Sequence, residues 1–243
     1  MSRNFELLER LREDQELFRI PPITNAKPRN GSLPDLDAFT REEVHRLVRC
    51  LFLATNSNGR NVPRRVVFCA IDQTDGSNLL CAQLGRSLAS QVESQVCVVD
   101  ANVRVPTNRL FDVDEPDSPA VAQSGITNKR LQRVTGNLWL LSSDSVAPNG
   151  SAPALEQMRA CIRDLGDEFA YVVISAPPAG LSSDAALLGQ MAEGVVLILE
   201  ANSTRRETAR KAKQAFDASN VRVLGTVLNN RTFPIPEALY RRI

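Results

Sequence analysis

Short apolar runs alternate with helical periods from residue 65 onward, and this alternation limits the fold more than any other feature of the chain. The strand-like runs cover residues 65–70, 95–100, 137–142, 171–175, 194–200 and 221–228, and helical spacing covers residues 77–91, 154–169, 183–192 and 204–219. Strands that are apolar on both faces and separated by helices are typical of a parallel sheet covered on two sides. We therefore predict an α/β fold with a doubly wound, mostly parallel sheet in three layers, α/β/α. Ligands of such sheets bind beyond the carboxyl ends of the strands, where the loops at Asp72, Asn102, Ala176 and Asn229 would converge.

The first part of the chain has a different organisation. Apolar residues at helical spacing predict an amphipathic helix over residues 4–18, and prolines make residues 20–37 an extended linker. Thr40 followed by Glu43 is a capping-box pattern, which predicts a helix over residues 41–54. We accordingly divide the chain into residues 1–39, an N-terminal helix with a Pro-rich linker, and residues 40–243, a single α/β domain with a C-terminal tail.

Charge, cysteine content and hydropathy argue against nucleic-acid binding, disulfides, a metal site and a membrane span. A net charge of +1 over 243 residues gives no global field that would attract nucleic acid. One histidine, His45, and an odd number of scattered cysteines predict a reduced, cytosolic protein with no metal site. The thiols are expected to be small buried hydrophobes. They are Cys50, Cys69, Cys81, Cys97 and Cys161. The longest apolar stretch is far too short for a membrane span.

Residues 71–78 stand where a phosphate-binding loop belongs, after the first strand-like run and before a helix. In the pattern G-x-x-x-x-G-K-[ST], glycines let backbone N–H groups surround phosphate, the lysine reaches the outer phosphates and the hydroxyl holds Mg²⁺. Here only Gly76 is retained, while Ser77 replaces the lysine and Asn78 the hydroxyl residue. Ile71 replaces the first glycine and, being β-branched, resists the positive φ of a phosphate nest.

Further motifs follow in a specific order. The segment 98–106 reads VVDANVRVP and the segment 171–178 reads YVVISAPP; SDA at 183–185, AEGVVL at 192–197, TRRE at 204–207 and GTVLN at 225–229 follow. From Thr40 to the C-terminus, this series resembles the cytoplasmic domain of bacterial tyrosine kinases of exopolysaccharide and capsule synthesis, relatives of the MinD/ParA-type P-loop ATPases. The resemblance implies a P-loop NTPase-like fold and an ATP-dependent tyrosine kinase as the family activity.

The departures from that family concentrate on its catalytic positions. Besides the changes at Ser77 and Asn78, Asn102 replaces the second acidic residue of the D-x-D motif and Ser175 replaces the Walker B aspartate. Phosphoryl transfer depends on positioning and charge neutralisation, so the loss of the cation and of the metal anchors removes most of what a protein contributes. Asp100 and Arg104 remain. Asp100 could face the former metal pocket or cap the next loop, and we assign no catalytic residue and no cofactor.

A weak nucleotide site is a separate expectation. It would consist of Asp75, Gly76, Ser77 and Asn78 at a helix N-terminus, where free N–H groups and the helix dipole attract anions, with Asn229 at the position where the related ATPases place an adenine-contacting Asn. A polar turn is the alternative interpretation of Asn229.

Three surface features suggest partners. Glu43, Arg46 and Arg49 match the E-x-x-R-x-x-R pattern that the resemblance links to ring assembly, and a solvated helix face is the alternative. The basic helix over residues 204–213, with Arg241 and Arg242, could meet anionic lipid or simply face water. The tail holds one tyrosine, Tyr240, in place of the family's tyrosine cluster.

Our leading hypothesis is a catalytically degenerate, tyrosine-kinase-like protein that regulates or scaffolds exopolysaccharide biosynthesis and export. It would be cytoplasmic, and peripheral at the inner membrane through a membrane co-polymerase or export protein, with self-association through the residue 43–49 helix. One alternative is an active ATPase or tyrosine kinase with an unusual loop, using ATP and Mg²⁺ held by Asp72, Asp75 or Asp100. Another is a MinD-like positioning protein that contacts membrane directly.

Overall fold

A single eight-stranded sheet forms the middle layer of the molecule. The computed structural model describes residues 17–19, 36, 38–54, 62–72, 76–102, 131–146 and 155–230. The strands are β1 (Leu17–Arg19), β2 (Arg65–Ala70), β3 (Val96–Asp100), β4 (Leu131–Thr135), β5 (Leu138–Leu141), β6 (Tyr171–Ala176), β7 (Val195–Glu200) and β8 (Val223–Asn229). Their order is β1-β8-β7-β2-β6-β3-β5-β4, and every pairing is parallel except that of β4 with β5. The predicted doubly wound, mostly parallel sheet is confirmed.

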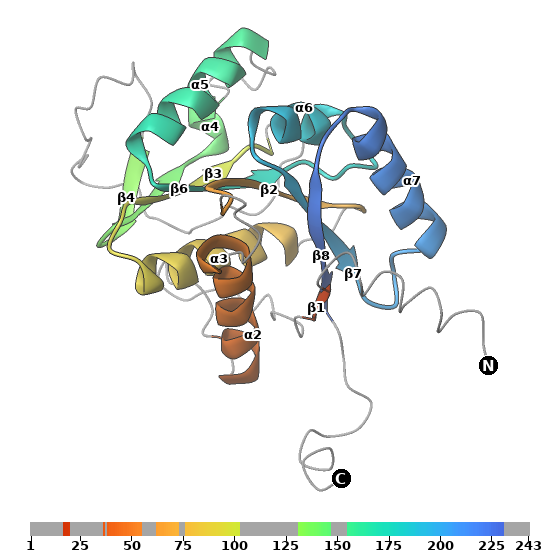
Figure 1. The fold of residues 1–243 in the computed structure, drawn as a ribbon, viewed down its shortest axis with the longest axis horizontal. Helices are drawn as coiled ribbons and strands as arrows, with labels where there is room; N and C mark the ends of the chain where they lie inside the picture. Colours follow the sequence, from red (N-terminus) through yellow and green to blue (C-terminus); the bar gives the residue numbers. More distant parts are fainter. Residues whose placement is uncertain are drawn as a thin grey trace, which may run out of the picture.

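Helices cover both faces of this sheet (Figure 1). The helices are α2 (Ala38–Val48), η1 (Arg49–Leu53), α3 (Gly76–Gln91), α4 (Ser143–Val146), α5 (Leu155–Glu168), α6 (Asp184–Met191) and α7 (Arg206–Ala218). The helices α2 and α3 lie on one face, and α5, α6 and α7 lie on the other (Figure 1). The predicted three layers are therefore present.

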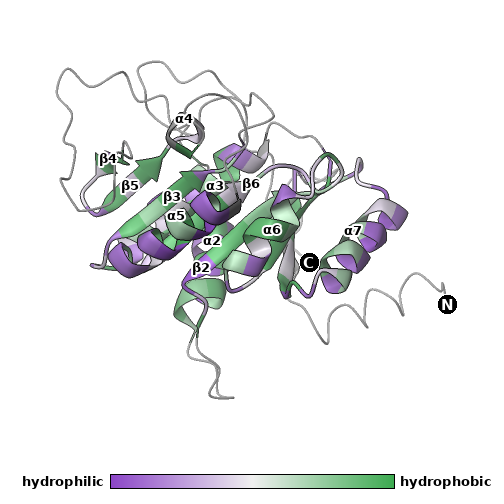
Figure 2. Ribbon diagram, turned by 90° about the horizontal axis from the view of Figure 1, so that it is seen from above, coloured by the Kyte–Doolittle hydropathy of each residue, from purple (hydrophilic) through white to green (hydrophobic). Residues whose placement is uncertain are grey.

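The central strands supply side chains to a separate apolar core on each face. In β2, for example, Val66 and Phe68 pack with α2 and α3, whereas Val67 and Cys69 pack into the cluster that contains α5, α6 and α7. Successive side chains of a strand point to opposite faces, so a strand buried on both faces must be apolar throughout. Figure 2 shows the apolar strands between helices, with hydrophilic residues along α5 and α7.

The helix expected over residues 41–54 starts earlier and ends differently. It begins at Ala38, so Thr40 lies inside the first turn and is fully buried, and the predicted capping box is wrong. From Arg49 to Leu53 the chain forms a π-helix that ends in extended backbone at Ala54. The wider turn places Phe52 in the core, against Tyr171.

Two strands were not predicted. Residues 17–19 pair with β8, although helical spacing predicts that the N-terminal helix extends to residue 18; the rest of that helix and all of the linker except residue 36 lie outside the described residues. The antiparallel hairpin of β4 and β5 turns at Gly136, whose φ of 43° suits glycine. Four of the five cysteines are buried, as expected, and Cys50 is exposed.

Candidate functional site

Three of the predicted site positions meet at the carboxyl ends of the strands. Asn78 lies in the first turn of α3, Ser175 lies near the end of β6, and Asn102 lies two residues after the end of β3. The strands β3 and β6 are neighbours, with Asp100 opposite Ser175 in the register. Asn78, Asn102 and Ser175 are all at least nine-tenths buried. The convergence that strand order predicts is therefore realised in side-chain contacts.

Direct hydrogen bonds join these three side chains. The Ser175 hydroxyl donates to Asn78 Oδ1 at 2.7 Å, and Asn102 Nδ2 donates to the same oxygen at 3.0 Å. Asn102 Nδ2 also lies 3.2 Å from Ser175 Oγ and 3.4 Å from the Ser175 carbonyl oxygen. The amide oxygen of Asn78 thus accepts from two donors, which is its ordinary capacity.

Asp100 caps the loop that follows β3. Its Oδ1 accepts the backbone N–H of Asn102 at 3.1 Å and Asn102 Nδ2 at 3.2 Å. A carboxylate that accepts a backbone N–H two residues on is a common local cap. Asp100 is also buried beside the Asn102 amide, so it borders the polar cluster as well as closing the loop.

A metal ion at this point would have to break the cluster. Mg²⁺ requires oxygen ligands in near-octahedral geometry, but Asn102 directs N–H donors inward and the Asn78 oxygen is already occupied. Among the residues that the structure describes, no group of three or more His, Cys, Asp or Glu side chains is placed to hold a metal. We call the linked set Asn78, Asp100, Asn102 and Ser175 the amide plug.

Cys81 extends the amide plug by one helical turn. Burial raises the pKa of its thiol to about 12, a hydrogen bond with Ser175 acts in the opposite direction, and the charge of Asp100 raises it. The thiol therefore stays protonated at neutral pH. Cys81 was not among the predicted site residues, although its position three residues after Asn78 puts both on the same face of α3.

Backbone hydrogen bonds and packing hold the start of the loop that follows β2. Ile71 is fully buried, its N–H donates to the Ile198 carbonyl at 3.2 Å, and its carbonyl accepts the Gly180 N–H at 3.1 Å. A Cβ on Gly180 would lie 2.9 Å from the Ile71 oxygen, so the loop after β6 packs directly on this backbone. As expected for a β-branched residue, the backbone of Ile71 does not have a positive φ, and its side chain lies in the core.

Asn229 lies on another strand and is not part of the amide plug. It is the last residue of β8, it is 1% exposed, and neither polar atom of its side chain has a hydrogen-bond partner among the described residues. Its strand neighbour Glu200 also has a buried oxygen, Oε2, without a partner. A buried amide without partners costs free energy. A ligand that reached this amide would therefore gain by forming hydrogen bonds with it.

Of the remaining residues that the sequence predicts for a site or an interface, the structure describes only some. Glu43 and Arg46 form an ion pair of 3.4 Å within α2, and Arg49 Nε donates to Gln91 Oε1 at 3.0 Å. Ser77 is buried, and Gly76 opens α3. Asp75, Arg104 and Tyr240 lie outside the described residues, as do Arg241 and Arg242.

In the basic helix α7, two ion pairs neutralise part of the charge. Lys211 pairs with Glu207 at 2.9 Å and Lys213 pairs with Asp217 at 3.2 Å. The exposed Arg205, Arg206 and Arg210 have no ion pair among the described residues. Within the described part of the chain, no helix has the length and apolarity needed to cross a bilayer.

Comparisons of sequence identify relatives of one kind. The chain is 24% identical over 185 residues to the putative tyrosine-protein kinase CapB of Staphylococcus aureus, covering 71% of this chain and 78% of CapB. It is 27% identical over 165 residues to the tyrosine-protein kinase YwqD of Bacillus subtilis, covering 65% and 68% of the two chains. No family model matches the chain.

Solved structures agree on the fold. The kinase domain of the Escherichia coli tyrosine kinase ETK superposes with a TM-score of 0.70 at 18% identity, over 94% of this chain and 96% of that domain. The chimerical protein CapA2B2 gives 0.69 at 16% identity, over 94% and 99%. A MinC:MinD complex of Aquifex aeolicus gives 0.52 at 14% identity, over 74% and 72%. The homologues of this chain are therefore bacterial tyrosine-protein kinases, and its fold is that of their kinase domains and of the MinD-like P-loop proteins.

Proposed function

We propose that this chain is a catalytically silent, tyrosine-kinase-like protein that regulates or scaffolds exopolysaccharide biosynthesis and export. The observation that carries the proposal is the amide plug. At the carboxyl ends of the strands, where a kinase of this fold would gather a metal and phosphates, three neutral side chains bond to one another: Asn78 of α3, Asn102 after β3 and Ser175 of β6. The single carboxylate among them, Asp100, already accepts two N–H donors from Asn102.

The lack of a lysine at position 77 matters as much for catalysis as the lack of metal ligands. A transition-state cation contributes about 10³ to 10⁵ in rate in phosphoryl transfer, on the example of arginine fingers. Ser77 has no charge to supply, and it is buried. Losing this contribution together with the metal ligands leaves too little transition-state stabilisation for useful turnover.

The proposed partner is a membrane polysaccharide co-polymerase or export protein, which would keep the chain peripheral to the inner membrane on its cytoplasmic side. Self-association would use Glu43, Arg46 and Arg49. Arg46 supports this part of the proposal because its side chain is 58% exposed despite the ion pair with Glu43, so it can still meet an acidic surface on a neighbouring subunit.

A turnover assay tests the silent-kinase proposal. Purified protein with ATP and Mg²⁺ is expected to release no phosphate above the buffer rate and to phosphorylate no tyrosine. The variant Asp100→Asn should behave identically, because Asp100 holds a loop and not a metal. Turnover by the unsubstituted chain that is lost in Asp100→Asn would contradict the proposal.

A second candidate function, nucleotide binding without turnover, is favoured by one specific observation. The buried side chain of Asn229 lies at the carboxyl ends of the strands, where a nucleotide would bind, and the described part of the chain gives it no hydrogen-bond partner. A base with donor and acceptor groups could satisfy this amide in the absence of a metal. Binding of adenosine that is independent of Mg²⁺, and lost in Asn229→Leu, would support this candidate.

A further inference from the structure

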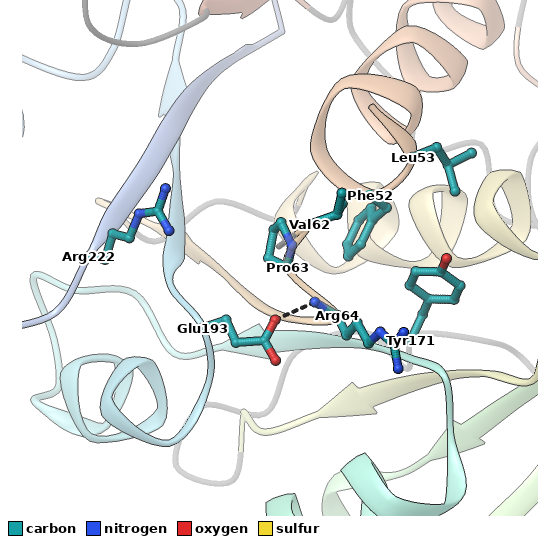
Figure 3. Close-up of a pocket in the computed structure, with 8 residues that line it drawn as sticks. All are labelled: Phe52, Leu53, Val62, Pro63, Arg64, Tyr171, Glu193 and Arg222. Atoms are coloured by element: carbon teal, nitrogen blue, oxygen red, sulfur yellow. Dashed lines mark hydrogen bonds between the residues drawn. The ribbon is translucent and has the colours of Figure 1, made fainter. Parts of the chain in front are cut away.

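A cavity of about 920 Å³ lies at the amino ends of the strands, on the opposite side of the sheet's length from the amide plug, which lies at their carboxyl ends (Figure 3). Four of its residues stand at or just before the amino ends of four adjacent strands. In the order of the sheet they are Arg222 before β8, Glu193 before β7, Arg64 before β2, and Tyr171 at the start of β6. Figure 3 shows them in this order, with Glu193 between the two arginines. The size falls within the range of small-ligand pockets.

One wall of the cavity is apolar and rigid. The π-helix η1 contributes Phe52 and Leu53, and Val62 and Pro63 line the cavity from the approach to β2. The Phe52 and Tyr171 rings meet edge to face, with centroids 6.0 Å apart and an interplanar angle of 88°. Aromatic pairs of this edge-to-face geometry contribute stability beyond the area that they bury, so the two rings support one another in the wall of the cavity.

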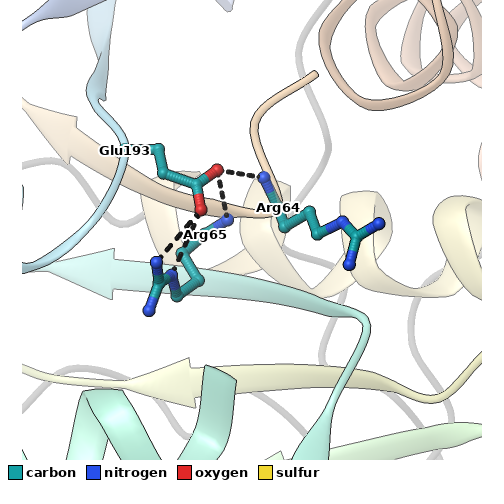
Figure 4. Close-up of polar contacts among 3 residues, drawn as sticks. All are labelled: Arg64, Arg65 and Glu193. Atoms are coloured by element: carbon teal, nitrogen blue, oxygen red, sulfur yellow. Dashed lines mark hydrogen bonds and ion pairs between the residues drawn. The ribbon is translucent and has the colours of Figure 1, made fainter. Parts of the chain in front are cut away.

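Glu193, the acidic residue that lines the cavity, forms an ion pair with Arg65. Glu193 Oε1 accepts Arg65 Nε at 3.3 Å and pairs with the Arg65 terminal nitrogen at 3.2 Å (Figure 4). Its Oε2 accepts the backbone N–H groups of Arg64 and Arg65. The guanidinium of Arg65 thus cancels the charge of Glu193, and both carboxylate oxygens are occupied.

Arg64 and Arg222 therefore leave the cavity with excess positive charge. Both are exposed, and no described residue gives either guanidinium a hydrogen bond or an ion pair. Guanidinium groups bind carboxylates, sulfonates and phosphates through charge-assisted hydrogen bonds. An apolar wall beside such groups favours a ligand that has both an anionic group and an apolar body.

We propose that this cavity binds an amphipathic organic anion, with its apolar or aromatic body against Phe52 and Tyr171 and its anionic group attracted by the positive charge that Arg64 and Arg222 supply on either side of Glu193. The site is independent of the amide plug, because it lies at the amino ends of the strands and the plug lies at their carboxyl ends. It goes beyond the proposed function, which makes no use of this edge of the sheet.

Fluorescence titration with anilinonaphthalene sulfonate tests the proposal on the intact chain. This probe has an aromatic body and one sulfonate, and we expect saturable binding of one probe per chain. The double variant Arg64→Gln/Arg222→Gln should weaken it about tenfold, the effect of losing about 1.4 kcal/mol of charge-assisted bonding. Arg210→Gln, an exposed arginine of α7, is the matched control and should leave the affinity unchanged.

A neutral probe separates the role of the charge from that of the apolar wall. Phenylnaphthylamine has the same aromatic body without the sulfonate, and its affinity should be equal in the unsubstituted chain and in the double variant. Three results would overturn the proposal: no saturable binding of the sulfonate, an affinity that the double variant leaves unchanged, or an equal loss with Arg210→Gln. Matching melting temperatures of the variants would exclude unfolding as the cause.

Discussion

The variant Asn102→Asp is expected to lower the free energy of unfolding by about 3 kcal/mol at pH 7. It introduces the acidic residue that the resemblance to the tyrosine kinases implies at this position, but the surrounding side chains bond to an amide. Asn102 Nδ2 donates to Asn78 Oδ1 and Asp100 Oδ1, at 3.0 and 3.2 Å. A carboxylate oxygen in its place would face two acceptor oxygens and add a second negative charge beside Asp100.

The same variant should show a characteristic pH dependence. Burial and the neighbouring Asp100 would raise the pKa of the new carboxyl group in the folded state above its unfolded value of about 3.9. The folded state then favours the protonated form, so stability is retained below about pH 4 and is lost as the pH rises through the raised pKa. Urea unfolding at pH 4 and pH 7 should therefore show a smaller defect at pH 4.

Asn102→Ala is the matched control for this prediction. It removes the amide without adding charge, so it should cost about 1–2 kcal/mol, with no such dependence on pH. Addition of Mg²⁺ should not restore the stability of Asn102→Asp, since the Asn78 oxygen remains occupied by the Ser175 hydroxyl. Recovery of the lost stability by millimolar Mg²⁺ would mean that a metal site survives here.

Gly85→Ala should destabilise the protein by about 2–3 kcal/mol, although alanine usually stabilises a helix by up to about 1 kcal/mol. A Cβ on Gly85 would lie 2.2 Å from Val98 Cγ2 and 3.4 Å from Leu138 Cδ1. The added methyl group would push α3 away from β3, and with it Asn78 away from Asn102. Chemical denaturation measures the loss directly.

A double-mutant cycle and a second glycine test this explanation. Val98→Ala removes the methyl group that Gly85→Ala would meet, so the double variant should be at least about 1 kcal/mol more stable than additivity predicts. In α5, a Cβ on Gly166 would meet the flexible end of Arg65, 2.9 Å away, so Gly166→Ala should change stability by less than about 1 kcal/mol. Strict additivity of Gly85→Ala and Val98→Ala would contradict close packing of α3 on β3.

The sheet could be predicted because the sequences of its central strands are continuously apolar. Strands such as β2 and β3 are apolar at nearly every position, since both of their faces are buried. The edge strands carry no such signal. In β4 only the first of five residues is buried, and half-buried residues alternate with exposed ones after it. Strand β1 is defined by its pairing with β8 rather than by its own spacing. The π-helix at residues 49–53 depends on the packing of Phe52, which a helical period cannot indicate.

The candidate site was partly predictable for a similar reason. Chain order and sheet topology place the residues after β2, β3 and β6 at one edge, so the convergence of Asn78, Asn102 and Ser175 follows from the motifs alone. Their mutual hydrogen bonds do not, because side-chain rotamers decide whether two amides face a common ligand or each other. The cavity beside Arg64 and Arg222 follows from no motif, because it forms where the starts of four strands meet the π-helix.

Calorimetric titration of the purified chain with ATP in the presence of Mg²⁺ tests the central claim most directly. The amide plug predicts no metal-dependent heat, and any weak binding through Asn229 should be the same with EDTA as with Mg²⁺. Micromolar affinity that requires Mg²⁺, and that disappears in Asp100→Asn, would contradict the account.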